Sequence, residues 1–167
     1  MFDPTIFENL KVVVEGAVYD LDFRGKLEII GRTDRIELSV MSRYYAIQFS
    51  LPGQPDKWAE LRLWADTEDL AGEILELNTV TLGCRMQPVF YKRLKDPAGE
   101  CPEIERLTAE IWGNHIGLMQ RIISVYGDND FLPLDEITVD FQRRFGEEVV
   151  QDLPEMLEHM LLMLDKL

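Results

Sequence analysis

The chain has 167 residues and a net charge of −14, because 31 Asp and Glu residues outnumber 17 Lys and Arg residues. Hydrophobic residues make up 46 % of it, which excludes a disordered chain. Its length suits one domain that buries about 70 % of the unfolded surface without needing disulfides or metals. Because the negative charge repels phosphate groups, we predict no binding to nucleic acid or to an anionic membrane surface.

Targeting signals are missing from the sequence pattern. The N-terminus has no basic segment followed by an apolar run, and the longest apolar stretch, Met160 to Leu164, is far too short to cross a bilayer. The two cysteines, Cys84 and Cys101, have neither CxxC spacing nor the density of a secreted scaffold. These features predict a cytoplasmic protein with free thiols.

The first ninety residues alternate between apolar and polar side chains, which is typical of half-buried antiparallel strands. The alternating runs are residues 36–40, 45–51, 61–65 and 80–86. Upstream of them, we expect Leu10 to Leu21 to form a long strand paired with Lys26 to Gly31, with Gly25 in the turn. One short helix interrupts the series near residues 67–76, after the capping candidates Asp66 to Asp69.

Helical spacing begins after a connection at residues 92–102, which contains two prolines and a glycine. Apolar residues then recur every three or four positions from Ile104 to Val125, and Gly127 is placed to end that helix. Residues 137–141 fit either a strand or a helix. A final helix follows Asp152, with a proline and a capping-box glutamate in its first turn.

Strands followed by helices indicate an α+β fold. We predict a single domain over residues 1–167: a meander-like antiparallel sheet in residues 1–91, the connection at 92–102, and a mainly helical part at 103–167. The C-terminal helices are expected to cover one face of the sheet. A domain boundary near residue 96 is less favoured, because each half would leave an apolar face exposed.

Motifs for common chemistries are missing. The sequence has no GxGxxG, GxxxxGK[ST], GxSxG or HExxH motif. Its only histidines are His115 and His159, too few for a multi-histidine metal site, and residues 128–136 fail the calcium-loop pattern at Pro133 and Val139. We therefore predict no catalytic residues, no cofactor and no metal ligands.

Candidate ligand-binding residues lie on the polar side of the predicted sheet. If the strands are neighbours, an aromatic among cations would form a platform for a peptide or an anionic ligand. The basic cluster at residues 92–95 could hold a phosphate or carboxylate, or could instead blunt a sheet edge. The candidates are Arg35, Arg62, Trp64, Arg85 and Arg93, with Gln87 on the same face.

The last helix is apolar over more than one stripe, and its methionines suit adaptable packing. Burial in the core is the first interpretation of this pattern, and a homodimer or partner interface is the second. The residues in question are Met156, Met160, Met163 and Leu164.

Three functional hypotheses follow. The first is a non-enzymatic binding protein, such as an adaptor, chaperone-like protein or inhibitor, that engages a basic macromolecular partner, because acidic surfaces accelerate association with basic ones. The second is a domain that binds a small anionic ligand. The third is an enzyme that uses carboxylates or a divalent ion, for which the 31 acids offer too many candidates to select any.

Overall fold

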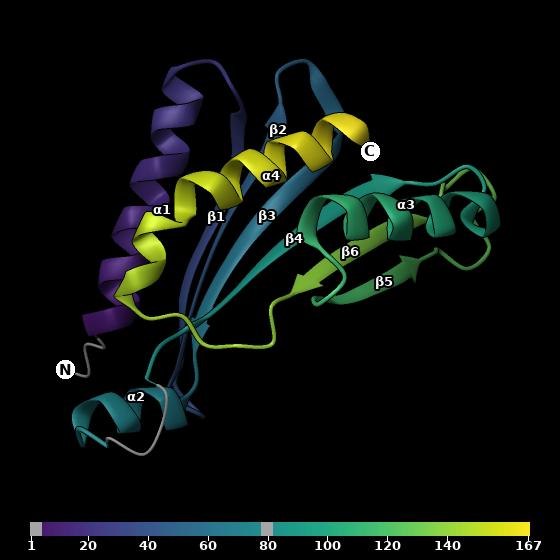
Figure 1. The fold of residues 1–167 in the computed structure, drawn as a ribbon. Coiled ribbons are helices and arrows are strands. Elements are labelled where there is room, and N and C mark those ends of the chain that lie inside the picture. The colour runs from purple at the N-terminus through teal and green to yellow at the C-terminus, as the bar shows by residue number, and fades with distance from the viewer. Residues whose placement is uncertain (1–4, 78–81) are drawn as a thin grey trace.

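A computed structural model describes residues 5–77 and 82–167 of the chain. The described residues form four α-helices, one 3₁₀-helix and a six-stranded sheet (Figure 1). In chain order the elements are α1 (Thr5–Phe23), β1 (Glu28–Glu37), β2 (Ser42–Leu51), β3 (Gln54–Ala65), α2 (Thr67–Ile74), β4 (Arg85–Arg93), α3 (Pro97–Trp112), β5 (Gly117–Ile123), β6 (Leu134–Asp140), η1 (Glu147–Gln151) and α4 (Leu153–Lys166).

Every neighbouring pair of strands is antiparallel, and the order across the sheet is β1-β2-β3-β4-β6-β5. The first four strands are consecutive neighbours, so this part is a meander, and the hairpin of β5 and β6 extends it. The predicted α+β fold with an antiparallel sheet is confirmed. No described helix is long and apolar enough to cross a membrane.

Helices cover one face of the sheet. Helices α1 and α4 lie over β1, β2 and β3, and α3 lies beside β5 and α4 (Figure 1). Between these layers is one hydrophobic core, in which the alternate strand residues Ile47, Phe49, Leu61 and Phe90 are fully buried. We call the other side the open face, because no described helix lies over its centre (Figure 1).

The strand predicted from Leu10 to Leu21 is wrong: these residues belong to α1. The valine-rich sequence suggested a strand, but Phe7, Leu10, Val14 and Val18 are buried at helical spacing against the core. Packing of one helical stripe therefore overrides the strand propensity of the valines. Gly25, with φ of +69°, follows the end of this helix rather than joining two strands.

Two neighbouring predictions also need correction. Residues 26–31 do not pair with α1; they lead into β1, which pairs with β2. The alternating run 36–40 spans the end of β1 and a turn, where Ile36, Leu38 and Val40 are exposed. The runs at 45–51 and 61–65 are confirmed as parts of β2 and β3. In the run at 80–86, residues 80 and 81 lie outside the described part and strand β4 begins only at Arg85.

The second half of the chain contains more strand than expected. Strand β4 continues to Arg93 and α3 begins at Pro97, so residues 92–102 are not an extended connection. The helix expected to reach Val125 stops at Trp112, where Gly113 has a φ of +88°, and β5 follows. The ambiguous residues 137–140 are in β6, while the short helix after Asp66 and the last helix are confirmed.

A buried carboxylate lies beneath α3. Asp135 on β6 is 0 % exposed, and neither of its carboxylate oxygens has a hydrogen-bond partner in the described structure. Lys92 faces it in the register of β4 and β6, but Lys92 Nζ lies 3.0 Å from Glu100 Oε2 instead. Burial raises the pKa of Asp135 to about 6, although the charge of Lys92 opposes this change.

Asp135 should make folding stability depend on pH. Because its pKa is higher in the folded state, Asp135 favours folding at low pH, and this contribution is lost as pH rises from about 4 through about 6. We expect the Asp135→Asn variant to gain up to about 3 kcal/mol relative to wild type over that range. Urea unfolding at a series of pH values measures this difference. The exposed Asp128→Asn serves as the control, and parallel curves for wild type and Asp135→Asn would refute the prediction.

Candidate functional site

A network of polar side chains crosses the open face from β2 to β5. Arg62 on β3 donates to Glu60 and, through Nη2, to Tyr91 Oη at 2.6 Å. The Tyr91 hydroxyl donates to Glu136 Oε2 at 3.2 Å, and Arg121 on β5 pairs with the same carboxylate. Side chains from four adjacent strands, β3, β4, β6 and β5, are thereby joined, and Gln48 and Tyr44 on β2 also donate to Glu60.

Burial and charge are balanced within this network. Glu60 is only 5 % exposed and Glu136 only 7 %, and removing a cationic partner from a buried carboxylate is strongly destabilising. Two carboxylates and two guanidinium groups leave no net charge. Burial alone would raise the pKa of Glu136, but the hydrogen bond from Arg121 and the charge of Arg62 hold it below its ordinary value.

An aromatic pair lies beside the network. The rings of Trp58 and Tyr91 face each other across β3 and β4, 5.0 Å apart and inclined by 12°. Burial, and next the nearby negative charge of Glu60, raise the pKa of Tyr91, so the phenol stays protonated and can donate to Glu136. In this part of the open face, the polar side chains of the network therefore form their hydrogen bonds and ion pairs with one another.

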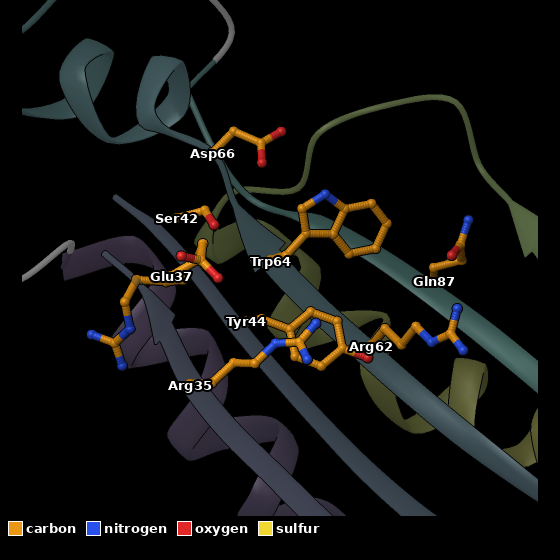
Figure 2. Close-up of a pocket in the computed structure, with 9 residues that line it drawn as sticks. Arg35, Glu37, Ser42, Tyr44, Arg62, Trp64, Asp66 and Gln87 are labelled. Carbon is orange, nitrogen blue, oxygen red and sulfur yellow. The ribbon is translucent and has the colours of Figure 1, made fainter. Parts of the chain in front are cut away.

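A groove of about 480 Å³ opens farther along the same face, towards the start of β4. The strand register assembles it: Arg35 pairs with Tyr44, Tyr44 with Trp64, and Arg62 with Gln87. Figure 2 shows the Trp64 ring at the centre, between Ser42 and Gln87. The lining residues are Arg35, Glu37, Ser42, Arg43, Tyr44, Arg62, Trp64, Asp66 and Gln87.

Most cations in or beside the groove already have acidic partners. Arg62 belongs to the network, Arg43 Nη2 lies 2.5 Å from Glu8 Oε1, and Arg85 Nη2 lies 3.4 Å from Asp66 Oδ2. Arg35 differs, because it forms no ion pair with a described carboxylate. Its guanidinium lies 4.3 Å from the centre of the Tyr44 ring (Figure 2). Arg35, Tyr44 and Trp64 are therefore the side chains best placed to contact a ligand.

The predicted ligand-binding residues are brought together only in part. Arg35, Arg62 and Trp64 line the groove, and Arg85 lines an adjoining hollow of about 300 Å³ that shares Trp64 and Gln87 with it. Arg93 lies at the opposite end of β4, about 26 Å from Arg85 for eight residues of extended chain. It contacts the Phe131 ring and the carbonyl oxygen of Leu132 instead.

Sequence reasoning missed Tyr44 and the whole network. The alternation that places Tyr45 and Ile47 inside also places Tyr44 outside, so the signal for Tyr44 was present. Alternation in β3 also places Glu60 beside Arg62, but no sequence signal brings Glu136 to them, because β6 joins β4 through a strand order that is not sequential.

The four residues considered for an interface are in the core. They contact the covered face of the sheet and α3, and the Trp112 indole lies 3.2 Å from the sulfur of one of them, Met163. Homodimerisation through these side chains would require the core to open. The buried residues are Met156, Met160, Met163 and Leu164.

Within residues 5–77 and 82–167, no three His, Cys, Asp or Glu side chains converge in a way that could hold a metal ion. The two thiols, on Cys84 and Cys101, are free, and burial raises the pKa of Cys84 to about 12. Comparisons with protein-family models, curated proteins and solved structures found no match to this chain. The geometry of the open face is therefore the basis for a functional proposal.

Two of the groove arginines, Arg62 and Arg35, should differ in their effect on folding. Arg62→Met leaves Glu60 and Glu136 buried with fewer partners and should cost about 3 kcal/mol of unfolding free energy. The matched variant Arg35→Met removes only an exposed cation–π contact and should change it by less than about 0.5 kcal/mol. Urea denaturation measures both, and equal losses would show that Arg62 is not a structural bridge.

Proposed function

We propose that this protein is a non-enzymatic binding protein that engages a basic macromolecular partner through the groove on its open face. The single observation behind the proposal is that the exposed Arg35 and the half-buried rings of Tyr44 and Trp64 line one groove, on a face whose buried charges are already paired. Arg, Tyr and Trp are the residue types that contribute most to binding at protein interfaces. The cytoplasmic setting expected from the sequence is part of this proposal.

The distribution of charge supports a basic partner. The five helices contain 16 acidic and three basic residues, whereas the six strands contain eight acidic and nine basic residues. Negative charge thus belongs mainly to the helices, and the sheet is close to neutral. Such a field attracts a basic protein from a distance, while the neutral open face offers contacts without strong repulsion.

Rigidity also supports the proposal. Ordering side chains at an interface costs affinity, and a surface that is already ordered avoids part of that cost. The groove lies next to the network, and Arg62 belongs to both. The platform is therefore held in place by interactions that fold the protein.

A small anionic ligand is the second candidate, and Arg35 is the observation in its favour, because this cation has no described acidic partner. The neighbouring Glu37 and Asp66 make the groove less suitable for a multiply charged anion than for a peptide segment. For the third hypothesis, an enzyme dependent on carboxylates or a divalent ion, residues 5–77 and 82–167 offer no cluster of three metal-ligating side chains.

Selection from a phage-displayed library of random peptides tests the groove. We expect the wild-type protein to enrich basic peptides, and Trp64→Ala to weaken their binding at least about tenfold, because the aromatic centre of the groove is lost. Affinity measured by fluorescence anisotropy should also fall as salt rises from about 50 mM to about 500 mM.

The control is Tyr126→Ala, which removes a fully exposed aromatic side chain away from the groove and should leave affinity unchanged. Enrichment of acidic peptides would favour the anionic ligand. The same conclusion would follow if inorganic phosphate stabilised the wild type but not Arg35→Ala. Peptides that bind Trp64→Ala as tightly as wild type would reject the groove as the binding site.

A further inference from the structure

Both histidines of the chain line one pocket on the helical side of the molecule. This pocket has a volume of about 410 Å³ and lies between the end of α3, the segment 141–145, η1 and the start of α4. Its lining residues are Ile111, Trp112, His115, Ile116, Phe141, Arg143, Phe145, Val149, Asp152, Glu155, Met156 and His159. We call it the two-histidine pocket; nothing in the open-face proposal uses it.

The floor of the two-histidine pocket is aromatic. The centre of the Trp112 ring lies 5.8 Å from the centre of Phe141 and 5.5 Å from that of His159, and the ring centres of Phe141 and Phe145 are 5.5 Å apart. All three pairs are packed edge to face. Trp112 and Phe145 are almost completely buried. The pocket therefore has a fixed apolar floor, and its volume is within the range of about 300–1,000 Å³ that is usual for binding pockets.

Backbone contacts hold one wall in place. Phe145 exchanges two backbone hydrogen bonds with Cys84, at 2.8 Å and 2.7 Å. Gly83 makes this approach possible, because a Cβ atom on it would lie 2.4 Å from the carbonyl oxygen of Phe145. The wall that carries Phe141 and Phe145 is thus tied to the chain just before β4.

The rim is polar and carries two acids against one arginine. His115, Asp152 and Glu155 are exposed around the opening, and Arg143 lies over the Phe145 ring, 4.4 Å from its centre. Beyond the rim, η1 and α4 continue with acidic residues, and their only basic residue is Lys166, at the far end of α4. An apolar floor within this negative rim is complementary to an apolar side chain flanked by lysine or arginine.

The two-histidine pocket is also connected with the groove. The hollow beside the groove shares Trp64 and Gln87 with it, and shares Arg143 with the two-histidine pocket. A single extended segment could therefore pass from the open face over residues 142–144 to the helical side.

We infer that the two-histidine pocket binds an apolar side chain of a basic segment, contributed by the same macromolecular partner that uses the groove. This inference rests on the proposed function, since it assumes a basic protein partner. Trp112, Phe141 and Phe145 contact the apolar side chain, and Asp152 and Glu155 pair with the cations beside it. His115 and His159 supply hydrogen-bonding groups for the backbone of the segment.

Charge reversal at the rim tests the inference. Peptides enriched from the random library on the wild-type protein are measured against Glu155→Lys and Glu158→Lys by fluorescence anisotropy. Both residues are exposed on α4 and both variants change the net charge equally, but only Glu155 lines the pocket. We expect basic peptides with an apolar residue to lose at least about tenfold in affinity on Glu155→Lys, and less than about threefold on Glu158→Lys.

Two further measurements make the result decisive. Replacing the apolar residue of such a peptide by serine should abolish the difference between the two variants. Equal losses on Glu155→Lys and Glu158→Lys would overturn the inference, because they would show only general attraction to the acidic helices. Trp64→Ala is measured in parallel: if it alone weakens binding, the groove stands and the two-histidine pocket is rejected, whereas loss on Glu155→Lys alone would reject the groove.

Discussion

Arg62 is the side chain on which the open face depends. An antiparallel sheet with one uncovered face usually keeps its charges in water, but here Glu60 and Glu136 are buried on that face. Burying a charged carboxylate costs stability unless a cation and hydrogen bonds compensate it. Arg62 contacts both carboxylates and the hydroxyl of Tyr91, so it joins β3, β4 and β6 through side chains in addition to the backbone ladder.

This arrangement places side chains that are able to bind directly beside the residues that fold the protein. The network neutralises itself, and Arg35 and Trp64 lie beside it together with the Tyr44 ring, whose hydroxyl donates to Glu60 (Figure 2). The negative charge is concentrated on the helices, away from the centre of the sheet. The acidic helices thus attract a basic partner over long range, whereas the open face contacts it at short range. The two-histidine pocket has an apolar floor and lies beside the acidic helices.

Sequence patterns predicted the class of fold well and the site only partly. Alternation in β2 and β3 and the capping signals of α2 and α4 are local, so they could be recognised without a structure. The valines of α1 predicted a strand and the evenly spaced Leu118 and Ile122 of β5 predicted a helix, and both predictions were wrong. Tertiary contacts, rather than local sequence, decide between helix and strand in these segments. Arg35, Arg62 and Trp64 were found from their common face, but only the strand register shows that Arg93 is remote and that Glu136 reaches Arg62.

The most direct test of this interpretation is a double-mutant cycle between Arg62 and Glu136. Unfolding free energies of Arg62→Met, Glu136→Gln and the double variant give the coupling between two residues on non-adjacent strands. If Arg62 bridges the buried carboxylates, the double variant is less destabilised than the sum of the single variants, by about 1–2 kcal/mol. Additive losses, with a coupling near zero, would contradict the central role given to Arg62 and leave its guanidinium available as a ligand-binding group.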